Sequence, residues 1–330
     1  MRAVVIQDFG PLESHKLEDV KSPEPGKGEV LIDVHAIGIN FPDTLMMQGL
    51  YQTKPERPFT PGRDVAGVVS AVGEGVTAVK PGDRIMALVP WGAYAEQCVA
   101  PEARCFPIPD ELDFVTAAGM LTVYLTAWVA LMVRGSYQPG EKVLVLGASG
   151  GVGLAAVQIA KAHGAVVVGA STSEARGKIV LENGADAVID LSVDDLGEGL
   201  RRQVFEAVGK EGVDIVLDPV GGDIFTAALR AMAFAGRIVC IGFVAGIPAA
   251  RPNYFNVKNL TLAGMALDLH FRFKPEIIQK AASDIFDLYK QGKIKPFVEA
   301  TYPLEDFQDA LARFKKTKSP GKLVLTTGRG

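Results

Sequence analysis

A glycine-rich run at residues 147–153 carries the most specific chemistry in the sequence. It reads Gly-Ala-Ser-Gly-Gly-Val-Gly, after an apolar run at 143–146 and at the start of a helical pattern at 152–163. Glycines in such a strand-to-helix turn let the backbone approach a pyrophosphate, toward which the helix N–H groups then point. We therefore expect a dinucleotide to bind here; the alternative is a tight turn without a ligand. The expected contacts are Ser149, Gly150, Gly151 and Val152.

Two further glycine turns stand at the ends of later strand-like runs. Val220-Gly221-Gly222 follows the run at 213–217, and Gly242 follows the run at 237–241. In a doubly wound sheet the carboxyl ends of the strands form the ligand crevice, so the cofactor is expected to extend along these turns toward its nicotinamide. The residues concerned are Val220, Gly221, Ile241, Gly242 and Phe243.

The residues after the second strand-like run of this region decide which dinucleotide is expected. An NAD-binding turn is followed, about 20 residues on, by an Asp or Glu that binds the ribose 2′-hydroxyl. Here the chain has Ser171 and Thr172, with Arg176 and Lys178 a few residues further. Hydroxyls can donate to a 2′-phosphate and the cations can offset its charge, so the pattern favours NADPH. Against this stand Glu174 and the alternative that both cations lie on an ordinary exposed helix face.

These turns need a parallel sheet to position them. From residue 143 onward, apolar runs of strand length alternate with helical patterns. Continuous Val/Ile/Leu runs separated by helices are typical of an α/β protein with a parallel sheet covered on both faces, and six of them predict a doubly wound Rossmann sheet. The runs are 143–146, 166–169, 187–189, 213–217, 237–241 and 260–263, with helices expected at 152–163, 174–183, 196–208 and 223–234.

The two ends of the chain have a different texture. Up to about residue 110, short β-like runs punctuated by Gly and Pro predict an all-β region. After the Rossmann pattern we expect a helix, a strand, a second helix and a last strand. The expected strands are 3–6, 29–37, 66–72, 84–88, 93–99, 297–302 and 322–326, and the expected helices are 275–290 and 304–314.

Length, charge and cysteine content exclude several classes of protein. The 330 residues correspond to about two domains, and 48% apolar residues exclude a disordered chain. The net charge of −4, without a dense Lys/Arg block, speaks against a nucleic-acid partner. Three cysteines without C-x-x-C spacing indicate a reducing compartment, so we expect the cytoplasm. The longest mostly apolar stretch, 119–133, is too short to span a bilayer, so no membrane is expected.

Several further motifs, in this order along the chain, resemble the zinc-free quinone oxidoreductase branch, related to zeta-crystallin, of the medium-chain dehydrogenase/reductase superfamily. The resemblance implies a partly open, GroES-like β-barrel catalytic domain at 1–124, completed by 267–330, with a Rossmann domain inserted at 125–266. It also implies a homodimer. The motifs are Gly38-Ile39-Asn40-Phe41-Pro42-Asp43, Pro61-Gly62-Arg63-Asp64-Val65-Ala66-Gly67, Gly73-Glu74-Gly75-Val76, Lys80-Pro81-Gly82-Asp83-Arg84, Tyr124-Leu125-Thr126-Ala127-Trp128 and Gly321-Lys322-Leu323-Val324-Leu325.

The same resemblance shows where a zinc ion would be held. Related zinc alcohol dehydrogenases place a cysteine where this chain has Asn40, a histidine where it has Arg63, and a second cysteine near 120–122, where none is present. A cationic Arg is no zinc ligand, so no metal is expected. Without a Lewis acid, an easily reduced acceptor is more plausible than an alcohol or ketone. Quinones and conjugated enones are such acceptors.

Hydride transfer from NADPH needs donors where negative charge develops on the acceptor. By resemblance, the position of Asn40 lies in the substrate cleft and that of Thr126 near the nicotinamide. Tyr51 lies in a segment similar to the one that carries the proton-donating tyrosine of mitochondrial-type 2-enoyl thioester reductases. The remaining candidate donors are Arg63 and Tyr124. The alternatives are a capped buried turn at Asn40, a packing role for Tyr51 and a structural ion pair for Arg63.

Residues from the end of the chain complete the expected site. Asn253 and Lys258 are spaced as in the family's segment that closes over the cofactor, and Lys322 by resemblance reaches the 2′-phosphate or the nicotinamide. Asp268 falls in a segment that lines the substrate cleft in relatives. The sequence thus predicts an NADPH-dependent reductase of quinones or other α,β-unsaturated carbonyls. Two alternatives stay open: a 2-enoyl-CoA or enone reductase with Tyr51 as proton donor, and a non-catalytic dinucleotide- or RNA-binding crystallin-like protein.

Overall fold

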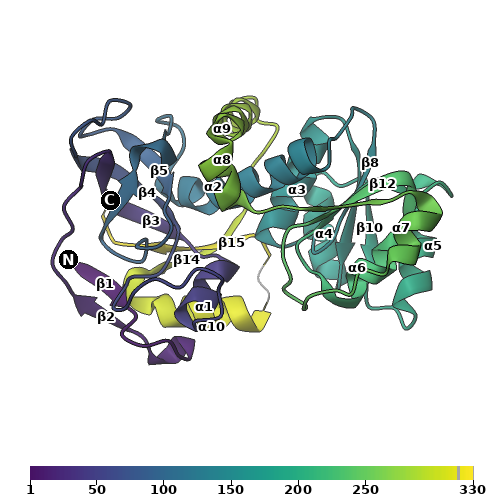
Figure 1. Ribbon diagram of the computed structural model, residues 1–330, viewed down its shortest axis with the longest axis horizontal. Coiled ribbons are helices and arrows are strands. Elements are labelled where there is room, and N and C mark those ends of the chain that lie inside the picture. Colours follow the sequence, from purple (N-terminus) through teal and green to yellow (C-terminus); the bar gives the residue numbers. More distant parts are fainter. Residues whose placement is uncertain (318–319, 330) are drawn as a thin grey trace. The chain divides into compact units, whose positions relative to one another are not determined.

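The computed structural model describes residues 1–317 and 320–329 and divides into two compact units (Figure 1). The first unit contains Met1–Thr122 and Pro296–Gly330, and the second contains Val123–Lys295. The chain therefore leaves the first unit, forms the second and returns, which agrees with an inserted domain.

The first unit is built on an antiparallel sheet with one parallel edge pair. Six strands of this seven-stranded sheet follow the order β14-β15-β3-β4-β5-β7, and the seventh, β6, pairs with β3, while β1 and β2 form a separate pair. The strands are β1 (Arg2–Val5), β2 (Lys16–Asp19), β3 (Glu29–Gly38), β4 (Asp64–Val72), β5 (Arg84–Leu88), β6 (Gln97–Pro101), β7 (Cys105–Pro107), β14 (Val298–Pro303) and β15 (Lys322–Thr326). Both chain ends thus contribute to one sheet, as expected.

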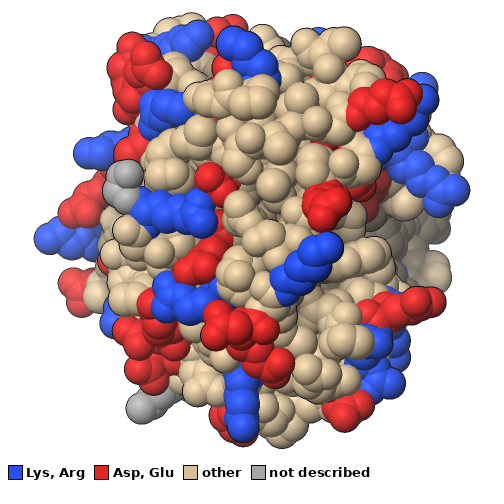
Figure 2. Space-filling model, turned by 90° about the vertical axis from the view of Figure 1, so that its left-hand side faces the viewer, with Lys and Arg blue, Asp and Glu red and all other residues tan. Residues whose placement is uncertain are grey.

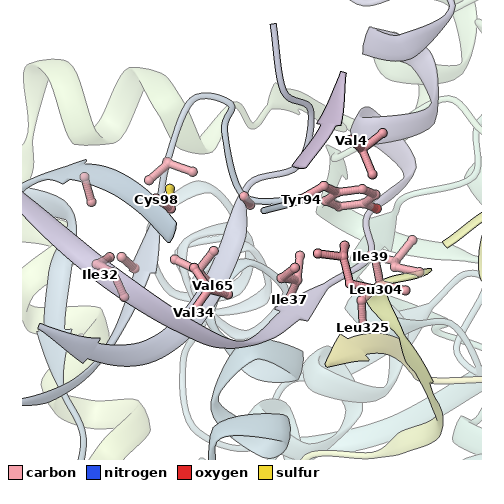
Figure 3. Packing of buried hydrophobic residues seen from close by; sticks show 14 of the residues in the cluster. Val4, Ile32, Val34, Ile37, Ile39, Val65, Tyr94, Cys98, Leu304 and Leu325 are labelled. Atoms are coloured by element: carbon pink, nitrogen blue, oxygen red, sulfur yellow. The ribbon is translucent and has the colours of Figure 1, made fainter. Parts of the chain in front are cut away.

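Apolar residues from both chain ends fill the core of the first unit. Figure 3 shows Ile32, Val34 and Ile37 of β3 pointing to the same side as Val65, and Leu325 of the C-terminal strand lying near Ile39. Alternate residues of a strand face the same side, which accounts for Ile32 and Val34, and the irregular register between Val34 and Ala36 breaks this alternation before Ile37. Burial of these side chains fixes the register of the strands whose ends carry the candidate site residues.

The prediction of an all-β N-terminal region is wrong at Phe41–Met47 and at two short 3₁₀-helices, Leu12–Ser14 and Glu102–Arg104. Residues Phe41–Met47 form the short helix α1, and Asn40 is its N-cap residue. The backbone N–H of Asn40 donates to Asp43 at 2.8 Å and Pro42 stands in the first turn, where its missing N–H costs nothing. The described part of this unit also contains the start of α2 (Phe114–Trp128), α10 (Phe307–Thr317) and a third short 3₁₀-helix, Leu304–Asp306.

The second unit contains the expected doubly wound parallel sheet. Its order is β10-β9-β8-β11-β12-β13. Successive strands are therefore added on one side of β8 up to β10 and on its other side from β11 onward. In Figure 1, α3 and α4 lie on one side of this sheet, and α5 and α6 pack on each other. The strands are β8 (Lys142–Val145), β9 (Val166–Ser171), β10 (Ala187–Asp190), β11 (Val213–Asp218), β12 (Met232–Cys240) and β13 (Thr261–Gly264). The helices are α3 (Gly151–Ala162), α4 (Glu174–Glu182), α5 (Leu196–Val208), α6 (Gly222–Leu229), α7 (Pro252–Lys258), α8 (Leu267–Phe273) and α9 (Pro275–Lys290).

The second boundary of the inserted unit lies later than expected. The division falls after Lys295 rather than after residue 266, whereas the first boundary differs from the expected one by two residues. The reason is helix α9, whose Asp284 accepts a hydrogen bond from the indole of Trp128 at 2.6 Å and lies 2.9 Å from His163. These contacts attach α9 to the Rossmann unit, and α8 packs against α9.

One helix is long and apolar enough to cross a membrane by length and composition. It combines α2 with a π-helical continuation, Val129–Arg134, and spans 21 residues with a mean hydropathy of 1.7. The apolar stretch is thus longer than the 119–133 expected, although 78% of its most apolar window is buried inside the structure. A buried core helix passes the same test, so the finding is weak evidence for a membrane.

Charged side chains of both signs are interspersed on the face shown in Figure 2. Among the described side chains of that face, no continuous basic area is visible. This face therefore lacks the electrostatic footprint that a nucleic-acid backbone requires.

Candidate functional site

The glycine turn connects β8 to α3 as the sequence predicts. Gly147 has a positive φ of 57°, and a Cβ on it would lie 2.8 Å from Val220. A Cβ on Gly153 would lie 2.2 Å from the carbonyl oxygen of Gly147, closer than real contacts allow. Both positions therefore require glycine, the first for its backbone conformation and the second for the close approach of α3 to the turn.

The first turn of α3 leaves backbone donors for a ligand. The helix begins at Gly150, which has no side chain to cap it, so the first N–H groups of the helix, including those of Gly151 and Val152, have no partner within the helix. The positive end of the helix dipole lies at the same place. Ser149, next to these donors, is buried with 8% exposure. This combination fits an anionic group such as a pyrophosphate.

The end of β9 brings the expected 2′-phosphate residues together only in part. Arg176, on α4, donates to the Thr172 hydroxyl at 3.4 Å, so these two side chains form one polar group. The Ser171 hydroxyl is buried and donates to the carbonyl of Ser173 at 3.1 Å. Ser171 therefore shapes the turn before α4, whereas Thr172 and Arg176 remain the better-placed pair for an exposed anion.

Asp218, at the end of β11, holds the second glycine turn and was not predicted. Its Oδ1 accepts from the N–H groups of Val220 and Gly221 at 2.8 and 2.9 Å, while Oδ2 is buried without a hydrogen-bond partner. Burial raises the pKa of Asp218, and these two N–H donors oppose the rise. An Asp directly before Pro-Val-Gly-Gly at a strand end was the available signal, because carboxylates there cap the following turn.

The segment after β12 packs against this turn. The N–H of Ala245 donates to the carbonyl of Val220 and the N–H of Gly222 to that of Gly246, both at 2.8 Å. Ile241 and Gly242 are half-buried and Phe243 is 47% exposed. The predicted nicotinamide-side residues therefore line one continuous edge at the carboxyl ends of β11 and β12.

A buried polar cluster occupies the first unit, between the start of α1, β4 and β15. Its central side chain is the Asn40 amide, whose Nδ2 donates to Asp64 at 2.9 Å and to the Gly38 carbonyl at 3.1 Å. The Asn40 Oδ1 accepts from Lys322 at 2.7 Å. Both amide hydrogens are thus engaged, which favours the structural alternative for Asn40, with Asp43 serving as its partner at the helix start.

Lys322 is held entirely inside this cluster. Its Nζ donates to the Ile39 carbonyl at 2.6 Å and to Asn40, and lies 3.6 Å from Asp64. The residue is 4% exposed, and burial lowers its pKa while Asp64 and Asp43 raise it. The ammonium hydrogens are therefore used within the first unit rather than presented to a 2′-phosphate.

Asp43 is a fully buried carboxyl of this cluster. Burial raises its pKa to about 7, against the opposing effects of the Asn40 N–H and of the charges on Lys322 and Arg63. Its Oδ2 accepts from Asn40 and from the hydroxyl of Tyr94 at 3.3 Å, while Oδ1 is buried without a partner. Burial and the Asp43 charge in turn raise the pKa of Tyr94. Perturbed carboxyls of this kind concentrate at functional sites.

Arg63 and Tyr51 form the second polar group of the first unit. Arg63 is 7% exposed and donates to the Val89 carbonyl at 3.4 Å and to the Tyr51 hydroxyl at 3.5 Å. Tyr51 itself is half-buried, so its ring is partly accessible. A guanidinium beside a phenol favours negative charge on the phenol oxygen. The structure thus brings together two of the four predicted catalytic side chains.

Tyr124 and Thr126 belong to the second unit. The hydroxyl of Tyr124 is buried and donates to Gln158 at 2.6 Å, and burial raises its pKa far above the usual range. Gln158 in turn binds Asn183 and Lys295, so this network ties α2 and α3 to the end of the unit. The geometry gives Tyr124 a structural role. Thr126 is buried with 7% exposure.

The expected segment after β12 is placed differently from the cofactor turns. Lys258 donates to the carbonyls of Arg230 and Met232 at 3.1 and 2.7 Å, which belong to the end of α6 and the start of β12. Asn253 lines a cavity with it, between α5 and α7. Asp268 lies in the first turn of α8, and the Nδ1 of His270 lies 3.1 Å from the Ala266 carbonyl of the same segment.

The side chains at the zinc position of related dehydrogenases do not fit a zinc ion. Asn40 is saturated by hydrogen bonds and Arg63 carries a positive charge, and neither supplies a thiolate, imidazole or carboxylate. Within residues 1–317 and 320–329, no group of three His, Cys, Asp or Glu side chains is placed to hold a metal ion. The glycine turn, by contrast, fits a dinucleotide.

Comparisons with known proteins agree with both units. A family model described as "Alcohol dehydrogenase GroES-like domain" matches residues 26–110, and one described as "Zinc-binding dehydrogenase" matches residues 151–285. The quinone oxidoreductase-like protein 2 homolog of Nematostella vectensis is 37% identical, over 99% of this chain and 89% of its own length. The human synaptic vesicle membrane protein VAT-1 homolog is 34% identical, over 99% and 87%.

Solved structures extend this similarity to three dimensions. The structure of mycobacterial Rv1454c complexed with NADPH superposes with a TM-score of 0.92 at 33% identity, covering 99% of this chain and all of that one. The similarity therefore includes both units and the segments that connect them.

Proposed function

The chain belongs to the medium-chain dehydrogenase/reductase family, in its quinone oxidoreductase branch, and from this premise we propose that it reduces quinones or other α,β-unsaturated carbonyls with NADPH, without zinc. It is an NADPH-dependent oxidoreductase. The observation that carries the proposal is the turn at Gly147–Gly153, which needs glycine at both of these ends and leaves helix N–H groups for a pyrophosphate.

Different residues of the chain would bind different parts of the cofactor. When bound, NADPH supplies the hydride and leaves as NADP⁺. We assign the pyrophosphate to the turn at Ser149–Val152 and the 2′-phosphate to Thr172 and Arg176. Val220, Ile241, Gly242 and Phe243 line the carboxyl edge along which the nicotinamide half would lie. Thr126 remains our proposal for a contact near the nicotinamide, by resemblance.

The zinc-free part of the proposal rests on the donor set. Arg63 stands where related zinc enzymes have a histidine, and a guanidinium repels a divalent cation. Arg63 instead offers positive charge to an acceptor oxygen that becomes negative as it receives a hydride. An acceptor that is easily reduced needs no stronger electrostatic stabilisation of this oxygen, which favours quinones and enones over simple ketones.

A second candidate reaction is favoured by the contact between Arg63 and Tyr51. In reduction of a conjugated thioester or enone, hydride adds to the β-carbon and the resulting enolate takes up a proton. The Tyr51 hydroxyl can give this proton, and the guanidinium 3.5 Å away stabilises the phenolate that is left. A quinone needs no such donor at this place, because its reduced oxygens exchange protons with water.

The experiment that separates the two reactions compares Tyr51→Phe with the parent protein. NADPH oxidation is followed with 1,4-benzoquinone and with crotonyl-CoA at saturating concentrations. If Tyr51 is the proton donor, kcat with crotonyl-CoA falls by about 100-fold or more, while the rate with quinone changes less than about twofold. Unchanged turnover of crotonyl-CoA would exclude the acid role, and the absence of turnover with either acceptor would overturn the proposed function.

We also propose a homodimer formed through the edge of the Rossmann sheet. Strand β13 is the last strand of that sheet, and its Leu262 is 44% exposed. An unpaired edge can add a strand from a second copy, which would extend the sheet across the dimer. Sedimentation equilibrium checks this: a monomer at micromolar concentration would contradict it.

The cysteine pattern supports a cytoplasmic location, and a small-molecule acceptor is the only partner that we propose besides a second copy.

A further inference from the structure

A cavity of about 520 Å³ lies on the second unit between α5, α6 and α7, which are neighbours in Figure 1. Four cationic side chains line it, together with two aromatic ones. The cations are Arg201, Lys210, Arg230 and Lys258, and the aromatic residues are Phe205 and Tyr254. We call this the α5–α7 pocket. Its volume lies within the range of small-molecule sites.

Positive charge in the α5–α7 pocket is only partly neutralised. Arg201 and Arg230 share one carboxylate, that of Glu198, at 3.2 and 3.0 Å. Among the described carboxylates, none lies within 4 Å of Lys210 or Lys258. The four cations thus have one of the described carboxylates, that of Glu198, within ion-pair distance. The pocket therefore carries an excess of positive charge.

The fold holds the Lys258 ammonium in a fixed position in this positively charged pocket. Its Nζ donates to the main-chain carbonyls of Arg230 and Met232, so the side chain is fixed rather than extended into solvent. Burial lowers its pKa, and the charge of Arg201 lowers it further. An anion placed between these two cations would relieve their repulsion, which gives binding free energy without any rearrangement of the fold.

The aromatic walls indicate what the anion is attached to. The guanidinium of Arg201 lies over the ring of Phe205 at 5.0 Å, and Tyr254 lines the same cavity. Such surfaces accept the flat face of a base, while Arg and Lys bind phosphate oxygens. Because more than one cation lacks a carboxylate, a ligand with two or more negative charges fits better than one with a single charge.

The α5–α7 pocket is distinct from the glycine turn. It lies where α6 ends and just before β13 begins, which is the amino edge of the parallel sheet. The glycine turn lies at the carboxyl edge, after β8. We propose that the α5–α7 pocket is a second anion site, which binds a small molecule with a pyrophosphate group and a planar base, such as a nucleoside diphosphate. This proposal does not depend on the hydride-transfer reaction.

The test is calorimetric titration of the NADPH-saturated protein with ADP, inorganic pyrophosphate and adenosine. Saturation with NADPH occupies the glycine turn, so remaining binding reports the second site. ADP is expected to bind, pyrophosphate to bind more weakly, and adenosine to give no measurable heat. Absence of ADP binding, or binding that NADPH abolishes, would overturn the proposal, because only the cofactor site would then be involved.

Matched variants locate the site. Arg201→Gln is expected to weaken ADP binding by on the order of tenfold, as is Lys210→Gln, whose side chain forms no hydrogen bond or ion pair with the described residues. Arg202→Gln is the control, because its side chain is 66% exposed on the same helix and pairs with Glu206 outside the pocket. Equal affinity in the pocket variants and the control would refute the assignment.

Discussion

Replacing Asp43 by asparagine tests whether the buried cluster of the first unit contains a carboxyl that resists ionisation. The pKa of Asp43 is raised from 3.8 to about 7 by burial. A folded pKa above the unfolded one means that the folded state holds the proton more tightly. The stabilisation is therefore complete below pH 3.8 and is lost as the pH rises through 7. Between about pH 5 and pH 7 this loss amounts to about 3 kcal/mol, as an upper value, since each pH unit corresponds to about 1.4 kcal/mol.

An asparagine at this position stays neutral at every pH and keeps an acceptor for the Asn40 N–H. The unfolding free energy of Asp43→Asn relative to the parent should therefore rise by up to about 3 kcal/mol from about pH 5 to pH 8, measured by urea denaturation at each pH. Asp83→Asn is the control: its backbone and Lys80 contacts lower the Asp83 pKa, so its relative stability should be constant over this range. A constant or falling difference for Asp43→Asn would show that Asp43 is ionised throughout, paired with Lys322 or Arg63, and would refute the reasoning.

Three further predictions concern other parts of the structure. Gly153→Ala places a Cβ 2.2 Å from a backbone oxygen, so NADPH affinity, measured by fluorescence titration, should fall by about tenfold or more; Gly264→Ala, which meets no atom within 4 Å, should bind normally. Lys322→Met leaves Asp64 buried without its cation and should lower the unfolding free energy by about 3–5 kcal/mol, of which the double variant with Asp64→Asn recovers a part; equal loss in both would contradict the ion pair. Burial, helped by the charge of Asp218, raises the pKa of Cys240 from 9.0 to about 11, so N-ethylmaleimide should modify it about 100-fold more slowly than a model thiol at pH 8.

The Rossmann unit could be predicted because its signals are local. Each strand contains a short apolar run, and helices α3 to α6 are each preceded by a glycine or polar residue, so the alternation of runs and helical patterns indicates the element types. Helix α2 gave no such signal, because a helix buried on all sides has no polar face and no periodicity. Helix α1 is only seven residues long, too short for an apolar helical period to be recognised in the sequence.

The candidate site could also be predicted only where its contacts are between residues close together in the sequence. The glycine turn is formed by neighbouring residues, so its place between β8 and α3 could be predicted from the sequence. The buried cluster joins residues that are far apart in sequence: Lys322 and Asn40 are separated by 282 positions, and Thr122 and Asp64 by 58. Such contacts depend on the closed fold. Sequence reasoning therefore named Asn40 and Lys322 as ligand contacts, and only the structure shows that they bind each other.

The most direct test of the central claim is the steady-state oxidation of NADPH and, separately, NADH with 9,10-phenanthrenequinone, for the parent protein and for Arg176→Gln. The account predicts turnover with NADPH, a kcat/KM for NADH lower by about tenfold or more, and a loss of most of this preference in the variant. Equal use of both cofactors by the parent protein, or no quinone turnover with either, would contradict it.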